Sequence, residues 1–376
     1  MTEKINLYIL GAGASNPDGV PVTSELIDQA FWNFGGKYDN KDMFLMGTWD
    51  KETEVLPIVK PVLELYDKFY GTDLVEKLKN YYKDGYHPVS LGIATNNIED
   101  FFSRLYYLSK GIESYNLNLT KQEISDLSKK ANYLFFHTLA HSTIGISKPK
   151  YYSTFVEKLL KRNGKHCIMS FNYDLLLEDV FTSRDYLKYD GYKWLYPEEL
   201  KWSYCINFNN VSGVPYDFPQ EEQARILYLK LHGSLNWSFC PLTQEVSMHT
   251  LHADAWIYKR FYKEELRCRN GSHVNLPLLI PPIKNKEIDS PELRSLWSKA
   301  YNLVSQAKEV HIIGYSLPEV DIEANKLLGQ LPVKMLERIV IVNPNKNHIN
   351  KFIRILQDKS KISLFDNFEQ YLVNYK

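Results

Sequence analysis

The sequence predicts an α/β protein built on a doubly wound, Rossmann-like parallel sheet. Three observations predict it. Short apolar runs without polar alternation are typical of strands buried on both faces. Turns rich in Gly, Ser and Asn follow several of these runs, and helical patterns lie between them. The expected strands are Ile5–Leu10, His166–Phe171, Ile226–Leu231, Leu278–Ile280, Val310–Ile313, Arg338–Val342 and Ile362–Phe365.

The composition describes a globular protein without a dominant charge. The 376 residues include 45 Lys plus Arg and 45 Asp plus Glu, so no global field favours nucleic acid or an acidic membrane. The four cysteines form no C-x-x-C pair, which suits a reducing compartment. No apolar run is long enough to span a membrane, and the first run is too short for a signal peptide. We therefore expect a cytoplasmic protein.

The first strand leads into the glycine-rich segment Gly11–Ser15, and we expect a helix to begin near Thr23 or Ser24. A strand, a glycine-rich turn and a helix together present backbone N–H groups to a phosphate. The G-x-G-x-x-G fingerprint is incomplete, because Asn16 stands in place of the third glycine. A tight turn without a ligand is the alternative interpretation.

A long helical stretch separates the first strand from the second. Apolar residues recur at helical spacing in Pro57–Tyr82, Ile98–Tyr107 and Leu127–Leu139. We therefore expect one domain, with residues 1–35 and 165–376 as the Rossmann-like core and residues 36–164 as a helical insertion or subdomain.

Two groups of histidines and cysteines invite a metal interpretation. His137 and His141 lie four residues apart on a helix, but Thr138 breaks the H-E-x-x-H pattern. A second group in the irregular segment 239–275 has none of the spacings of a zinc knuckle or ribbon. Its members are Cys240, His249, His252, Cys268 and His273. Ordinary packing is favoured for both groups, and we expect no metal.

Polar residues also follow the second and third long strands. Asn172 and Asp174 stand at a strand-to-helix turn, where an amide and a carboxylate can hold a polar ligand, although Asp174 could simply cap the helix. His232, in Tyr228–Trp237, stands where a strand ends, and its imidazole can exchange protons near neutral pH. The alternative is a histidine that merely caps the strand.

The last third of the chain repeats the strand-and-turn arrangement. Ser290-Pro291-Glu292 predicts a helix start, with Ser290 as the cap. Gly314–Pro318 and Asn343–Asn345 then follow two apolar runs as polar turns, and helices over Ile349–Leu356 and Phe368–Val373 close the chain.

These turns together resemble those of the sirtuin superfamily, in the family's order. Five segments carry the resemblance to the sirtuin motifs G-A-G-x-S…G-I-P, Q-N-I-D, L-H-G-S-L, G-T-S-L and I-N. They are Gly11–Ser15 with Gly19–Pro21, Phe171–Asp174, Leu231–Leu235, Gly314–Leu317 and Val342–Asn343.

The sequence also departs from the family pattern. It lacks the two C-x-x-C pairs of the sirtuin zinc ribbon, and Val22–Ser24 stands in place of D-F-R. The segments Asn97–Phe102 and Gly314–Pro318 look like the bacterial branch, in which sirtuin-like domains hydrolyse NAD⁺ in antiphage defence. The resemblance thus implies an NAD⁺ hydrolase that produces nicotinamide and ADP-ribose and depletes NAD⁺ during abortive infection.

The resemblance also assigns roles to residues, with NAD⁺ as substrate. Asn172 and His232 would be catalytic and flank the nicotinamide ribose, with Asp174 near the carboxamide. The remaining cofactor-binding positions would be Gly11, Ala12, Gly13 and Ser15 at the pyrophosphate, Gly314 and Ser316 at phosphate or ribose, and Asn343 at the adenosine ribose.

Two other functions stay open at this point. One is a protein-lysine deacylase, against which the missing cysteine pairs count. The other is a non-catalytic subunit that senses NAD or ADP-ribose. For partners, the resemblance implies a homo-oligomer, a HerA-type ATPase or an Argonaute-type protein, without direct binding to nucleic acid or membrane.

Overall fold

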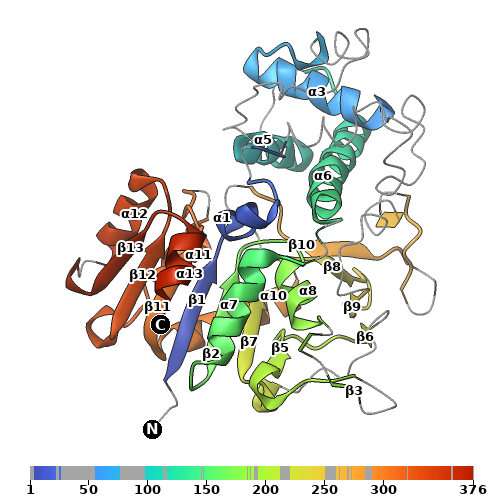
Figure 1. Cartoon of the computed structure of the whole chain (residues 1–376). Helices are drawn as coiled ribbons and strands as arrows, with labels where there is room; N and C mark the ends of the chain where they lie inside the picture. Colours follow the sequence, from blue (N-terminus) through green and yellow to red (C-terminus); the bar gives the residue numbers. More distant parts are fainter. Residues whose placement is uncertain are drawn as a thin grey trace, which may run out of the picture.

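The computed structural model describes most of the chain (Figure 1). The described residues are 4–22, 25–26, 56–76, 98–112, 117–144, 146, 148–183, 185–186, 188–189, 194–211, 221–249, 260–261, 263–268, 271, 273–283, 290–319, 321–356 and 359–375. Within these ranges, no helix has the length and apolar character needed to cross a bilayer.

A seven-stranded, entirely parallel sheet forms the centre of the molecule, as the apolar runs predicted. The strand order is β13-β12-β11-β1-β2-β7-β5. Every residue of β1, β2 and β7 is buried, because helices cover both faces of the sheet. The bounds are β1 Ile5–Leu10, β2 His166–Ser170, β5 Trp202–Ser203, β7 Ile226–Lys230, β11 Ala307–Ile313, β12 Arg338–Val342 and β13 Ile362–Phe365.

The chain changes direction across the sheet next to β1. It proceeds from β1 to β2 and β7 on one side, then crosses to β11 on the other side of β1. Open α/β sheets bind ligands at such a switch point, outside the carboxyl ends of the strands. The glycine-rich segment after β1 and the turn after β11 both lie at this point, so the fold brings two of the predicted segments together.

Helices cover both faces of the sheet, which confirms the doubly wound fold. On one face α7 (Lys150–Leu160) packs against α8 (Leu176–Phe181) and α13 (Phe368–Asn374). On the other face α10 (Pro291–Val304) packs against α11 (Ile322–Leu328). A further helix, α12, spans Lys346–Leu356. As predicted, Ser290 caps α10 by accepting the N–H of Leu293.

A helical lobe stands over the carboxyl edge of the sheet (Figure 1). It contains α3 (Leu56–Tyr70), α5 (Ile98–Lys110) and α6 (Lys121–Thr143), and α6 packs against the other two. Within the predicted helical stretch Pro57–Tyr82, α3 ends at Tyr70 and a new helical segment begins at Leu74, while residues 77–82 lie outside the described residues. Gly71 adopts a φ of 65° after Tyr70, and the carboxylate of Asp67 accepts the N–H groups of Leu74 and Val75 at the start of the new segment.

The helical insertion predicted at residues 36–164 includes α7. That helix packs on α8, α13 and the short 3₁₀ turn at Asn16–Asp18, all outside the helical lobe. The segment Gly11–Ser15, expected as an open turn, is itself helical, because α1 spans Ala12–Ser15. The helix start predicted at Thr23 or Ser24 lies outside the described residues.

A second, smaller sheet was mostly not predicted. Its order is β10-β8-β9-β6, in which β8 pairs antiparallel with β10 and β9, whereas β6 pairs parallel with β9. β9 lies in the segment predicted to be irregular, and β10, which overlaps the predicted strand Leu278–Ile280, pairs with β8 instead of joining the main sheet. A two-stranded pair, β3 (Lys188–Tyr189) and β4 (Trp194–Leu195), completes the strands. The bounds in the second sheet are β6 Asn210–Val211, β8 Gly233–Phe239, β9 Val246–Met248 and β10 Leu276–Leu279. Short 3₁₀ turns cover Glu198–Leu200, Glu221–Gln223, Val333–Met335 and Lys359–Lys361.

Candidate functional site

The hydroxyl of Ser15 joins the loop after β1 to the turn after β2. It donates a hydrogen bond to Asp174 Oδ2 at 2.8 Å and accepts one from Asn172 Nδ2 at 2.9 Å. The hydroxyl of Tyr152 on α7 lies 3.0 Å away. Ser15 is fully buried, so its hydroxyl organises other residues at this edge. Such buried networks fix side chains in one arrangement.

Asn172 and Asp174 are held from several sides. The Nδ2 group of Asn172 also donates to the carbonyl of Gly11 at 2.9 Å. The other oxygen of Asp174 accepts the N–H of Leu176 at 3.2 Å, so this carboxylate helps to cap α8 as well as binding Ser15. Both interpretations of Asp174, cap and site residue, are therefore compatible with its contacts.

The loop after β1 and the turn after β11 touch through their backbones. The N–H of Gly13 donates to the carbonyl of Gly314 at 2.9 Å. A Cβ on Gly314, whose φ is 62°, would lie 2.2 Å from the nitrogen of Ala14. Only glycine permits both the left-handed conformation and this approach. The two segments predicted to share a ligand are thus neighbours.

Several amides of the first loop are used within the protein. Gly11 donates to Ile313, Gly13 to Gly314, and Ala14 back to Gly11. Gly13 and Gly314 remain half-buried, as do Ala12 and Ser316, whereas Ser15 does not reach the surface. Part of the predicted pyrophosphate site is therefore accessible to solvent, whereas the Ser15 hydroxyl bonds to Asp174 and Asn172 inside the protein.

His232 stands at the end of β7 and pairs with a carboxylate. Its Nε2 lies 3.3 Å from Oδ1 of Asp321, the residue before α11. The other oxygen of Asp321 accepts the hydroxyl of Tyr315 at 2.8 Å. His232 and Asp321 are each only about 5% exposed. Burial and, next, the Asp321 charge raise the pKa of the Tyr315 phenol, which stays protonated and donating.

Aromatic rings connect His232 with Asn172. Phe171 and Tyr173, the two neighbours of Asn172, face the imidazole with ring centroids 5.1 and 6.0 Å away. Phe171 also stacks on Tyr315 at 4.3 Å, across the end of β1. The rings of Phe135 and Phe136 on α6 contact Tyr173, so the helical lobe packs against this edge.

A buried ion pair supports the turn after β2 from below. The Nζ of Lys230 on β7 donates to Glu178 at 2.8 Å and to the backbone carbonyls of Tyr173 and Asp174. Lys230 and Glu178 are completely buried. Burial raises the pKa of Glu178, and the Lys230 charge opposes that rise. The pair was not predicted, although a lysine inside an apolar strand is an unusual signal.

The other predicted positions lie on the opposite side of β1. Ser316 is half-buried in the turn after β11. Asn343 is buried, donates to the carbonyl of Tyr315 at 3.0 Å and accepts the N–H of Asn345. Asn343 thus shapes the turn that carries Gly314 and Ser316, and its contact with an adenosine ribose stays a prediction.

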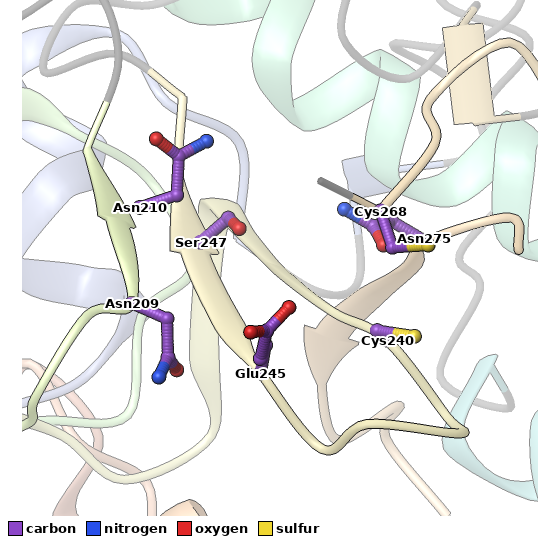
Figure 2. Close-up of a pocket in the computed structure, with 7 residues that line it drawn as sticks. All are labelled: Asn209, Asn210, Cys240, Glu245, Ser247, Cys268 and Asn275. Carbon is purple, nitrogen blue, oxygen red and sulfur yellow. The ribbon is translucent and has the colours of Figure 1, made fainter. Parts of the chain in front are cut away.

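A small polar pocket lies apart from these residues, in the second sheet (Figure 2). It has room for about one water molecule. Backbone N–H groups donate to both cysteine sulfurs, from Thr243 to Cys240 and from His273 to Cys268. Hydrogen bonding by the side chain of Thr243, and next by its backbone, lowers the pKa of the Cys240 thiol. The lining residues are Asn209, Asn210, Cys240, Glu245, Ser247, Cys268 and Asn275.

Neither histidine–cysteine group assembles a metal centre within the part of the chain that the structure describes, where no three His, Cys, Asp or Glu side chains are suitably grouped. His137 and His141 stack with ring centroids 5.9 Å apart on α6. His249 instead contacts the hydroxyl of Ser238 at 2.7 Å, and its pKa falls to about 4 through burial. His252 lies outside the described residues.

Known proteins resemble this chain only distantly. No protein-family model matches the chain, and neither does any curated protein. A solved structure described under the mechanism and regulation of Sir2 enzymes shares 16% identity, with 74% of this chain and 87% of that chain covered and a TM-score of 0.40. A Sir2 mutant described with a p53 peptide and NAD shares 12% identity, with coverages of 100% and 92% and a TM-score of 0.35. A function has to be argued from the residues themselves.

Proposed function

We propose that this chain binds NAD⁺ at the carboxyl edge of its sheet and hydrolyses the bond between nicotinamide and ribose. The observation that carries the proposal is the assembly of three distant segments into one polar edge. Ser15 joins the first loop to Asn172 and Asp174, and the neighbours of Asn172 contact His232. These are the residues in which the sequence resembles sirtuins, in the same order.

The half-buried residues at the switch point support the binding of a dinucleotide phosphate there. Ala12, Gly13, Gly314 and Ser316 are half-buried, and the backbones of Gly13 and Gly314 touch. The N–H groups of both glycines already donate within the protein, to Gly314 and Val342, so the Ser316 hydroxyl is the group here that suits a phosphate oxygen. In this proposal the buried Ser15 does not touch phosphate, which revises its implied role, and Ser316 supplies the hydroxyl instead.

The reaction needs groups that orient the ribose and a water molecule. Cleavage of the N-glycosidic bond releases neutral nicotinamide and leaves a sugar with oxocarbenium character. Asn172, fixed by Gly11 and Ser15, orients the ribose and the water. His232 accepts the water's proton or binds a ribose hydroxyl. The products are ADP-ribose and nicotinamide.

A water acceptor distinguishes this proposal from a deacylase. A deacylase transfers the ADP-ribosyl group to an acyl-lysine, and sirtuin deacylases carry a zinc module that this sequence lacks. A sensing subunit would bind NAD⁺ without turnover. Depletion of NAD⁺ in antiphage defence, by a homo-oligomer or with a HerA-type or Argonaute-type partner, is the biological role that fits the hydrolase.

The test is to incubate the purified full-length chain with NAD⁺ in ¹⁸O-water and to identify the products by mass spectrometry. Hydrolysis yields nicotinamide and ADP-ribose that carries ¹⁸O at the anomeric carbon, without any peptide. Asn172→Ala and His232→Ala should remove the activity, and Glu323→Gln, on the surface of α11, should retain it. Assays over a range of protein concentrations, with size-exclusion chromatography, test self-assembly.

Two other results would replace the proposal. O-acetyl-ADP-ribose formed only with an acetylated peptide would establish a deacylase. Tight NAD⁺ binding without turnover, with the chain alone, over the concentration range and with a HerA-type or Argonaute-type partner, would establish a sensor.

A further inference from the structure

We propose that Asp321 is the positioning residue of His232. This inference rests on the proposed function, because His232 acts on the ribose or the water only if that function holds. Neither the sequence pattern nor the resemblance to sirtuins singled out Asp321.

Asp321 does not use its side chain in the way that its place in the fold suggests. It stands at the N-cap of α11, where an aspartate usually accepts a backbone N–H of the first turn. Its side chain makes no such capping bond. The carboxylate instead turns toward the sheet edge, where Oδ1 meets His232 and Oδ2 accepts the Tyr315 hydroxyl. The helix start forgoes its usual cap for contacts at the candidate site.

The geometry selects one form of the imidazole. A carboxylate can only accept hydrogen bonds, so a neutral His232 places its proton on Nε2, facing Asp321. Nδ1 is then the basic nitrogen. When His232 takes up a proton, the carboxylate at 3.3 Å stabilises the resulting cation. Asp321 thus sets both the orientation and the basicity of the ring.

Two phenols share the surroundings of the pair. The ring of Tyr173 lies beside the imidazole, and the hydroxyl of Tyr315 donates to Asp321. Burial, then the Asp321 charge and also that of Glu99, raise the pKa of both phenols. Both phenols therefore stay neutral where imidazole titrates, so they do not contribute to a pH profile in that range.

The first experiment compares NAD⁺ turnover by Asp321→Asn with that of the natural protein between pH 5 and 9. We expect kcat to fall about 10- to 100-fold, as when a partner that orients a histidine is lost, with KM changed less than about threefold. The acidic limb of the profile should move to lower pH, because the imidazolium loses its stabilising charge. Asp321→Glu should restore part of kcat, and Glu323→Gln on the same helix is the matched control.

A second measurement does not require activity. The imidazole of His232, identified by the signal missing from His232→Gln, is titrated by NMR in the natural protein and in Asp321→Asn. The variant should protonate at lower pH. If the natural protein turns over NAD⁺ and Asp321→Asn shows the same rate, pH profile and His232 titration, the role of Asp321 would be overturned. The proposed function would stand in that case. If the titration shifts in Asp321→Asn but the natural protein does not turn over NAD⁺, the proposed function would be overturned, and with it this role.

Discussion

Among the residues that the structure describes, two buried histidine–carboxylate pairs lie at different levels of the main sheet. At the carboxyl edge, His232 lies 3.3 Å from Asp321. Toward the amino end, His311 lies 3.6 Å from Glu309, both on β11. The distances and the burial are similar, yet the surroundings differ, so a comparison of the pairs separates a candidate site from the architecture around it.

The third partner is what distinguishes the two pairs. Glu309 also pairs with the guanidinium of Arg162. Although burial opposes it, pairing with His311 and Arg162 lowers the pKa of Glu309 to about 2. Burial lowers the pKa of His311, so this imidazole stays neutral. Asp321 instead accepts the hydroxyl of a phenol, which carries no charge. The two pairs thus differ in the group that shares the carboxylate, a guanidinium at Glu309 and a phenol at Asp321.

The largest expected effect comes from removing each imidazole in turn. His232→Ala should reduce NAD⁺ turnover on the order of 10²–10⁴-fold, as for the loss of a general base. His311→Ala should lower stability but leave turnover per folded molecule within about twofold, because His311 lies outside the proposed NAD⁺ site. Turnover is measured with urea denaturation on the same samples. Equal losses of turnover in the two variants would show that the two histidines do not differ in function.

The second effect concerns the buried ion pair between Lys230 and Glu178, which supports the turn after β2. Lys230→Met leaves Glu178 buried without its cation, which costs about 3–5 kcal/mol for a broken buried pair. The double variant Lys230→Met with Glu178→Leu should recover much of that stability, since it removes both charges. Denaturant unfolding measures both. A single variant as stable as the natural protein would contradict the buried pair.

The third effect is a pH dependence of stability at the amino end. Burial lowers the pKa of His166 to about 4, so the folded state resists a proton that the unfolded chain accepts below about 6.5. Stability should therefore fall by on the order of 1–3 kcal/mol as the pH drops from 6.5 to 4. Urea denaturation across this range measures the slope, and His166→Gln should flatten it. An unchanged slope in that variant would assign the effect to other groups.

The smallest effect comes from a phenol at the amino end. The hydroxyls of Tyr8 and Tyr375 lie 2.6 Å apart in a buried contact. Tyr375→Phe should cost about 1 kcal/mol, the typical net value of one hydrogen bond, and should leave NAD⁺ turnover unchanged. Thermal unfolding and a turnover assay together check it. A turnover defect here would show that the two ends of the sheet are coupled.

Most strands of the main sheet were predictable, and burial on both faces, which leaves a continuous apolar run, explains β1 and β12. The edge strand β13 also has the predicted bounds although its residues are half-buried or exposed, and the two-residue strand β5 was not predicted. β8 was missed for the opposite reason: Ser234, Asn236 and Ser238 alternate with apolar residues, although all three are buried. The sequence showed Gly233 as a turn, whereas Gly233, with a φ of 81°, starts a strand and pairs with Leu279 of β10.

The candidate site was predictable only as far as strand ends could be recognised. Asn172 and His232 follow β2 and β7, which are neighbours in the sheet, so their proximity follows from the strand order. Asp321 was not predictable, because an aspartate before a helix is normally a cap. The turn that redirects it includes Leu317 with a φ of 49°, a backbone conformation that no residue pattern signalled.

The contact between Gly13 and Gly314 also has a consequence for biosynthesis. β1 is made first but pairs with β2 and β11, which emerge about 160 and 300 residues later. At a ribosomal rate of about 5–20 residues per second, the first loop waits roughly 15–60 seconds for its counterpart. A nascent chain that ends before residue 314 cannot form the switch point. If the chain consumes NAD⁺ as proposed, a cell that makes it would be protected from it until Gly314 has been synthesised.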